Sequence, residues 1–316
     1  MTLRRLHPVS RPMAIALVIL LAGRALTAQP SVQSSAQDLI DTVKVLASPE
    51  LAGRRTGTPG NAKARAWIVE QFGKARLTPI NGSFEVPFTF KRDGAESKGV
   101  NVVGLCRGSD ASVPGPVIVV SAHYDHLGVR DGAIYHGADD NGSGVAVVLA
   151  LARQCQTTPW RHDVVFAAFD AEEMGLQGAR AFVAAPPVAK ERIALNVNLD
   201  MVSRSAAREI YVAGTYHRPT LKPLLEPVAA RAPIKVLFGH DQPKAQAGGV
   251  DDWTLQSDHG AFHAAGIPFV YFGVEDHADY HKPTDTVDKI DVSFFAGVAQ
   301  TVLDAVTVLD RAIPLK

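Results

Sequence analysis

The sequence predicts an α/β protein, a three-layer sandwich in which helices cover a central mixed, mostly parallel β-sheet. Two observations predict this fold. Short runs rich in β-branched residues recur along the chain, and segments with helical periodicity lie between them. Continuous apolar runs of this length suit strands that are buried on both faces. After the first 28 residues no Pro/Gly/Ser-rich linker or internal repeat divides the chain, so we expect a single domain over residues 29–316.

The N-terminal half of the fold is predicted by three kinds of pattern: helical spacing of apolar residues, alternating phenylalanines and continuous apolar runs. Helices are expected at residues 38–47 and 62–75, where apolar residues recur at helical spacing. Phe84, Phe88 and Phe90 then indicate a packed edge strand. Buried strands are expected at residues 100–105 and 117–121, and a helix at residues 145–155.

The C-terminal half continues the same alternation. Further buried strands are expected at residues 164–169, 193–199 and 268–272, with a short helix at 260–265 before the last. The chain ends in a helix whose apolar stripe comprises Phe295, Val298, Val302, Val306, Leu309 and Ile313. Residues 204–256 have the least regular pattern, so we expect them to form loops over the site.

The composition is that of a globular protein. Of 316 residues, 47% are hydrophobic and 20% are charged, which excludes a mainly disordered chain. The 32 basic residues balance 32 acidic ones, which argues against a basic nucleic-acid-binding protein. Two cysteines cannot build a disulfide framework or a Cys-rich zinc site. Cys106 and Cys155 fit as small core or surface residues, and whether they pair is left open.

The first 28 residues have the order of a cleaved secretory signal. Four arginines and no acidic residue accompany an apolar run over residues 13–22, and small residues follow up to Ala28. About ten apolar residues are too few to span a bilayer. No later stretch is expected to be long and apolar enough to do so. We therefore expect a signal peptide at residues 1–28, a periplasmic or extracellular protein, and no membrane contact after cleavage.

Metal-binding and acid–base side chains follow the expected strands. They comprise His123, Asp125 and His126 after the second buried strand, Asp170, Glu172 and Glu173 after the third, Asp200 after the fourth, and Tyr280 and His281 after the fifth. Asp139 and Asp140 lie in a glycine-rich loop before the helix at 145–155. In open α/β sheets ligands bind outside the carboxyl ends of the strands, so these side chains should meet at one edge.

Imidazole and carboxylate oxygen, with little sulfur available, suit zinc, or manganese or cobalt as substitutes. Closely spaced carboxylates repel one another, and two divalent cations would relieve that repulsion. The residues alone therefore predict a metal centre with two ions.

The ordered motifs resemble metallopeptidase family 28, the dizinc aminopeptidases with a phosphorylase/hydrolase-like zinc exopeptidase fold. The resemblance covers nearly all of residues 29–316. Its segments are 46–57, 101–104, 137–144, 166–175, 198–201, 257–259 and 280–286, in the family's order.

The resemblance implies a role for each site residue. It assigns His123 and Asp200 to one zinc, Glu173 and His281 to the other, and Asp140 to a bridge between them. Glu172 would be the general base. Asp125 would orient His123, and Tyr280 would face the substrate carbonyl. The peptide bond between Asp140 and Asn141 is expected to be cis, as in relatives.

The function implied is hydrolysis of N-terminal residues from peptides. Peptides are the expected partners and nucleic acid is not, and the sequence leaves the oligomeric state undetermined. A glutaminyl cyclase-like acyltransferase with a single zinc is the main alternative on the same fold. The loop Asp140–Gly144 favours a peptidase, because cyclases typically carry Asp-Ser-Ala-Val-Pro there. A glutamate-type carboxypeptidase or dipeptidase, and a binding ectodomain that has lost its metals, are further alternatives.

Overall fold

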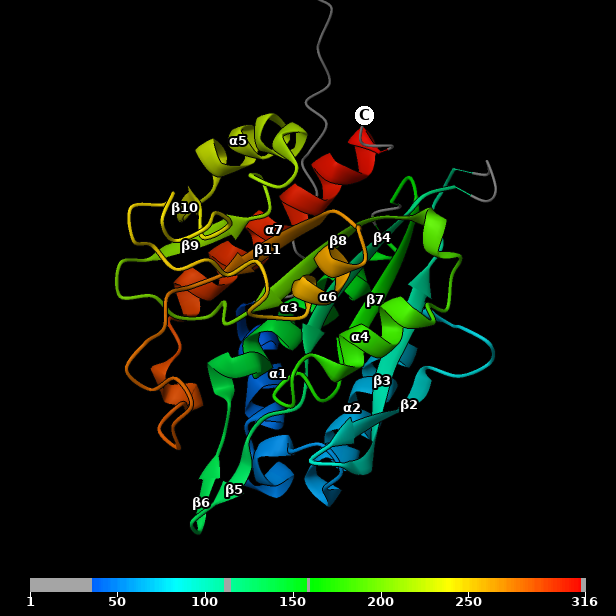
Figure 1. Cartoon of the computed structure of the whole chain (residues 1–316), viewed down its shortest axis with the longest axis vertical. Helices are drawn as coiled ribbons and strands as arrows, with labels where there is room; N and C mark the ends of the chain where they lie inside the picture. Colours follow the sequence, from blue (N-terminus) through cyan, green and yellow to red (C-terminus); the bar gives the residue numbers. More distant parts are fainter. Residues whose placement is uncertain (1–35, 111–114, 158–159, 314–316) are drawn as a thin grey trace, which may run out of the picture.

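The computed structural model describes residues 36–110, 115–157 and 160–313 (Figure 1). The expected signal peptide at residues 1–28 lies outside these residues. A nine-stranded sheet forms the centre, with strand order β1-β3-β7-β4-β8-β11-β9-β10 and with β2 paired to β3. Its strands are β1 (Thr78–Pro79), β2 (Glu85–Arg92), β3 (Ala95–Cys106), β4 (Val117–His123), β7 (Asp163–Phe169), β8 (Ile193–Asp200), β9 (Glu209–Ala213), β10 (Lys235–Phe238) and β11 (Phe269–Gly273).

The sheet is mixed, and its centre is parallel. Strands β7, β4, β8 and β11 run parallel to one another, whereas β3 pairs antiparallel to β7 and β9 pairs antiparallel to β11. The five buried strands expected from the sequence are all present, and β2 is the strand that carries Phe88 and Phe90. A separate hairpin, β5 (Gly128–Arg130) and β6 (Ala133–Tyr135), projects from the sandwich (Figure 1).

Helices cover both faces of the sheet, which confirms the three-layer prediction. They are α1 (Ala36–Leu46), α2 (Pro59–Lys74), α3 (Gly144–Gln154), α4 (Gln177–Ala184), α5 (Lys222–Arg231), α6 (His259–Ala264) and α7 (Val292–Ala312). Figure 1 looks onto the face covered by α4 and α6. Successive strand residues point to opposite faces. In β7, Val164 and Phe166 accordingly join the larger core under α1, α3 and α7, while Val165 and Ala167 join the core under α4 and α6.

Residues 204–256 are more regular than expected. They contain β9, α5 and β10, which extend the sheet beyond β11, and only the segment after β10 remains irregular. The prediction missed these strands because they are short: β9 has five residues and β10 has four, and β10 is only partly buried. Helix α4 was also missed.

Among the residues described, one helix, α7, is long and apolar enough to cross a membrane by length and composition alone. The expectation that no segment after the leader would meet that criterion is therefore wrong. Most of its apolar window, 61%, is buried inside the protein, and α7 packs against α1, α3 and α5. Burial of this kind is typical of the core helix of a globular protein.

Cys106, at the end of β3, and Cys155, at the end of α3, form a disulfide. The bond joins the sheet to the helix that follows the Asp140 loop. It closes a chain segment with a sequence separation of 49 residues.

We expect reduction of this disulfide to lower the free energy of unfolding by about 4 kcal/mol, because the crosslink restricts the unfolded chain. Urea unfolding of the oxidised and the reduced wild-type protein measures the difference without any mutation. This expectation would be contradicted if two free thiols titrated in the native protein before any reduction and if reductant left its free energy of unfolding unchanged.

Candidate metal centre

The six residues expected to bind metal or act as the base converge at one edge of the sheet. His123 is the last residue of β4 and Asp200 the last of β8, while Glu172 and Glu173 follow β7. These three strands are parallel neighbours, so their carboxyl ends lie side by side. Two further elements complete the group, the turn Ala138–Ser143 that carries Asp140 and the loop after β11 that carries His281.

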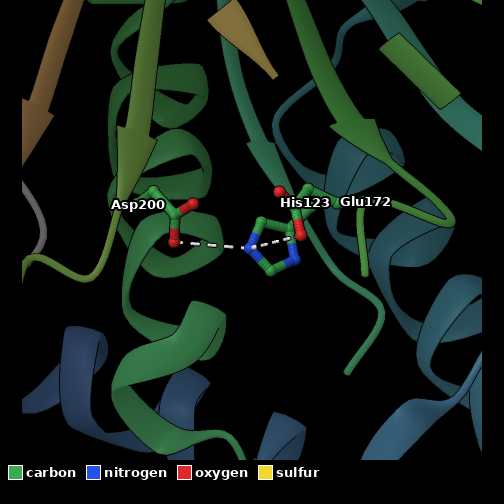
Figure 2. Close-up of side chains that lie close together, drawn as sticks. All are labelled: His123, Glu172 and Asp200. Carbon is green, nitrogen blue, oxygen red and sulfur yellow. Dashed lines mark hydrogen bonds and ion pairs between the residues drawn. The ribbon is translucent and has the colours of Figure 1, made fainter. Parts of the chain in front are cut away.

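The first set of ligand atoms surrounds His123. Its Nε2 atom lies 3.3 Å from Asp200 Oδ1 and 3.4 Å from Asp140 Oδ1. Glu172 approaches the same nitrogen less closely, with Oε2 at 3.9 Å. Figure 2 shows His123 between Asp200 and Glu172, which come from different sides of the ring.

The second set surrounds His281. Its Nε2 atom lies 3.2 Å from Asp140 Oδ2 and 3.4 Å from Glu173 Oε2. Asp140 thus faces one histidine with each of its two carboxylate oxygens. This is the arrangement that a bridging carboxylate requires.

These separations fit zinc. Ligand atoms about 2.1 Å from a tetrahedral ion lie about 3.4 Å from one another. The four nitrogen–oxygen separations in the two sets run from 3.2 to 3.4 Å. Each set offers one imidazole and two carboxylate oxygens, the donor types that zinc takes in catalytic sites.

His126 is an additional residue at the second set: the sequence favours it as a site-wall or hydrogen-bonding residue, and the resemblance assigns it to neither zinc. Its side chain is fully buried, and Nδ1 lies 2.8 Å from Glu173 Oε1, though neither atom has a partner aligned for a regular hydrogen bond. A separation of 2.8 Å is shorter than that between two ligands of one tetrahedral zinc. His126 nevertheless belongs, with Asp140 and Glu173, to a group of side chains that could hold a metal ion.

The turn that carries Asp140 is held by backbone and side-chain hydrogen bonds. The peptide bond between Asp140 and Asn141 is cis, as expected. The Asp285 carboxylate accepts hydrogen bonds from the backbone N–H groups of Asp139 and Asp140, at 3.0 and 3.1 Å. Asn141 donates to the carbonyl of Leu199, one residue before Asp200, at 2.9 Å. The turn is thereby tied to the strand that carries the other ligand of the first set.

Asp125 contacts His123 mainly through its backbone. The backbone oxygen of Asp125 lies 3.1 Å from His123 Nδ1, whereas the carboxylate is 3.8 Å from that nitrogen. The carboxylate instead accepts hydrogen bonds from the N–H groups of Glu172 and Glu173, at 3.0 and 3.3 Å. Asp125 therefore positions the two glutamates through their backbone as well as the histidine.

Arg54 is fully buried behind the site and has no carboxylate in contact among the described residues. Its guanidinium donates to four backbone carbonyls, those of Leu46, Tyr124, His136 and Gly137. Gly53 has φ +68°, and a Cβ there would lie 2.4 Å from the carbonyl oxygen of Tyr135, so a larger residue does not fit. The arginine joins the end of α1, the residue after β4 and the segment before the Asp140 turn.

Burial and neighbouring carboxylates perturb the acids of the site. Burial raises the pKa of Glu172 well above its usual range; His123 opposes the shift, and Asp200 adds to it. Burial, with the nearby charge of Asp200, also raises the pKa of Asp258 to about 7, and His123 opposes that shift. Both oxygens of Asp258 are buried without a hydrogen-bond partner. A buried cluster of carboxylates of this kind is stabilised by cations.

The residues of the two sets line an open cavity of about 390 Å³. Tyr280 also lines it, and its ring stacks on His281 with centroids 3.9 Å apart. Trp253, Leu255 and Gln256 form part of the wall, so the segment after β10 does cover the site as expected. His259 is buried and donates to the backbone carbonyl of Trp253 at 2.8 Å, and burial lowers its pKa to about 3. It shapes the wall as a neutral residue.

The chain is similar in sequence to curated proteins. Aminopeptidase YwaD from Bacillus subtilis (strain 168) is 31% identical over 252 residues, covering 77% of this chain and 50% of that protein. The chain spans about half the length, or less, of the first curated relatives that it matches.

Two solved structures share the fold. An aminopeptidase from Aneurinibacillus sp. strain AM-1 matches with a TM-score of 0.68 at 19% identity, covering 86% of this chain and 93% of that chain. The glutaminyl cyclase of Porphyromonas gingivalis matches with a TM-score of 0.68 at 21% identity, covering 88% and 99%. At these identities the likeness concerns the fold alone. Residues 101–306, more than half of the chain, match the family model of peptidase family M28, and the chain therefore belongs to that family.

Proposed function

We propose that this protein is an aminopeptidase that uses two zinc ions to hydrolyse N-terminal residues from peptides. The observation that carries the proposal is the position of Asp140, whose two carboxylate oxygens face the imidazoles of His123 and His281 at 3.4 and 3.2 Å. Such a bridge supports two neighbouring ions better than one. The name of the relative YwaD supports aminopeptidase activity.

In this proposal each acidic residue has a separate task. Asp140, Glu173 and Asp200 hold metal together with the two histidines. When bound, the two ions would polarise the scissile carbonyl and lower the pKa of a water molecule. Glu172 lies farther from His123 Nε2 than Asp140 or Asp200 does, and its carboxylate is left to take a proton from the attacking water.

Glu172 then passes that proton to the leaving amine as the carbon–nitrogen bond breaks. Tyr280 lines the cavity beside His281, where it would face the substrate carbonyl. Asp276 also lines the cavity, and its carboxylate would bind the α-ammonium group of the substrate.

We further propose that the protein works in the periplasm or outside the cell. The apolar leader supports export, and the disulfide between Cys106 and Cys155 supports an oxidising compartment. Residues 29–316 would then be the working protein.

The proposal is tested by counting metal and measuring hydrolysis in one preparation. We expect residues 29–316 to retain about two zinc ions per chain after dialysis and to cleave aminoacyl-nitroanilides and short peptides. A chelator should abolish cleavage, and added zinc or cobalt should restore it.

Three outcomes would contradict the proposal in different ways. Hydrolysis that survives full metal removal would exclude the metal mechanism. One ion per chain together with cyclisation of an N-terminal glutamine would support an acyltransferase instead. Release of C-terminal glutamate without release of N-terminal residues would indicate a carboxypeptidase.

A further inference from the structure

A second cavity of about 410 Å³ lies beside the metal-binding one. The two share three lining residues, Leu176, Arg180 and Leu255. The remaining lining residues of the second cavity come from the end of α4, from Lys190 and from α6 with the residue after it. The two cavities are therefore neighbours that meet at these three residues.

The charge of the second cavity is opposite to that of the first. Arg180 and Lys190 line it, no acidic residue does, and the other lining residues are apolar or small. Within the described parts of the chain, neither cationic side chain makes an ion pair or hydrogen bond. The metal-binding cavity, by contrast, is lined by Asp140, Glu172, Glu173, Asp200 and Asp276.

The second cavity also has an uncovered apolar wall. Leu255 is 62% exposed although it is a large hydrophobic residue, and it stands between the two cavities. Val183, Ala261 and Ala264 add apolar surface on the two helices. A ligand that covered this wall would remove apolar area from water, which is favourable.

The position of the second cavity relates it to the leaving-group side of the reaction. Two of its lining residues, Leu176 and Arg180, come soon after the proposed general base Glu172 in the chain. Leu176 lies in the turn that follows Glu172, and Arg180 lies in the first turn of α4. The leaving amine must be near the group that protonates it. The part of the substrate released on cleavage therefore lies toward Arg180.

We propose that this second cavity binds the C-terminal residue of a short peptide, with its apolar side chain against Leu255 and its free carboxylate beside Arg180 and Lys190. The proposal rests on the proposed aminopeptidase function and names its substrate class, dipeptides and tripeptides that end in an apolar residue. An acidic side chain within a longer peptide offers the same carboxylate chemistry. The apolar walls favour the C-terminus, because there the carboxylate and an apolar side chain belong to one residue.

The experiment compares substrates that differ only in the terminal charge. Leu-Phe and Leu-Gly-Phe are each assayed as the free acid and as the C-terminal amide, and Leu-Gly-Glu amide tests the acidic side chain. We expect kcat/KM to be about tenfold higher for the better of the two free acids than for its amide. One charge-assisted hydrogen bond to the terminal carboxylate is enough to produce a difference of this size. A preference for Leu-Gly-Glu amide over Leu-Gly-Phe acid would overturn the assignment to a C-terminus.

Variants connect that ratio to the cavity. Arg180→Gln, and more fully Arg180→Gln with Lys190→Gln, should bring the acid-to-amide ratio close to one. Arg311→Gln removes an exposed arginine near the end of α7 and should keep the wild-type ratio. An unchanged ratio in the double variant would exclude these two cations as the carboxylate site.

A binding measurement keeps this inference separate from the proposed function. In the zinc-loaded Glu172→Gln protein, calorimetry should show about tenfold tighter binding of the better free acid than of its amide, whether or not the wild type turns over. Ala264→Trp, which fills the cavity from α6, should weaken binding of that acid. Equal binding of acid and amide would overturn the second site while leaving an active aminopeptidase intact. Lack of any hydrolysis would contradict only the proposed function.

Discussion

Replacing Glu172 by glutamine should reduce kcat for peptide hydrolysis by about a thousandfold while leaving the zinc content near two per chain. The expected loss follows from general acid–base catalysis, which contributes roughly 10²- to 10⁴-fold. Glutamine has nearly the same shape as glutamate, so it preserves packing against the turn that Asp125 holds. It cannot accept the proton of the attacking water or return it to the leaving amine.

The retention of metal is the part of this result that assigns the role. Glu172 Oε2 is 3.9 Å from His123 Nε2, whereas the oxygens of Asp140 and Asp200 lie at 3.4 and 3.3 Å. Metal counted by atomic absorption and kcat measured on the same sample distinguish a base from a ligand. Glu96→Gln, at an exposed position of β3, is the matched control and should behave as wild type. A Glu172→Gln protein that kept near wild-type kcat would refute the assignment.

The sequence predicted the part of the site that depends on strand ends. Buried strands leave a clear apolar run, and in a parallel arrangement their carboxyl ends must meet. His123, Asp200, Glu172 and Glu173 could therefore be placed together without knowledge of any side-chain contact. The residue pattern also brought Asp140 and His281 to this edge, and the resemblance to the family then assigned these two residues as metal ligands.

The parts that the sequence missed depend on contacts between distant segments. Asp285 accepts the N–H groups of the Asp140 turn across 145 and 146 residues of chain. His126 carries no signal beyond its nearness to Asp125, and its role depends on which way the buried ring points. Strands β9 and β10 were missed for another reason, because they are short: β9 has five residues and β10 has four.

The role of Arg54 also depends on contacts between distant segments, and replacing this residue should have a large effect on stability. The sequence places it in a segment that resembles the start of the family pattern, with no role attached. In the fold its guanidinium satisfies four backbone carbonyls from three separate parts of the chain. Burial lowers the pKa of Arg54 to about 10, and Asp140 and Asp125 oppose that shift, so the side chain stays charged at neutral pH.

We expect Arg54→Met to lower the free energy of unfolding by about 4 kcal/mol, because it leaves four buried carbonyls without donors and removes a buried positive charge near the site's carboxylates. Arg54→Lys should recover only part of the loss. An ammonium has three donors and no planar fork, so it cannot reach carbonyls distributed around a guanidinium. Urea unfolding of the zinc-free proteins measures both values.

The neighbouring residue supplies the control that makes this prediction specific. Arg55 lies in the same segment but is only partly buried, so Arg55→Lys should change the unfolding free energy by less than about 0.5 kcal/mol. If Arg54 acts by holding the backbone before the Asp140 turn, Arg54→Lys should also weaken zinc binding, although Arg54 contacts no proposed ligand side chain. Loss of stability with unchanged zinc affinity would mean that the arginine supports the fold alone. Loss of both would mean that the metal geometry depends on a residue buried behind it.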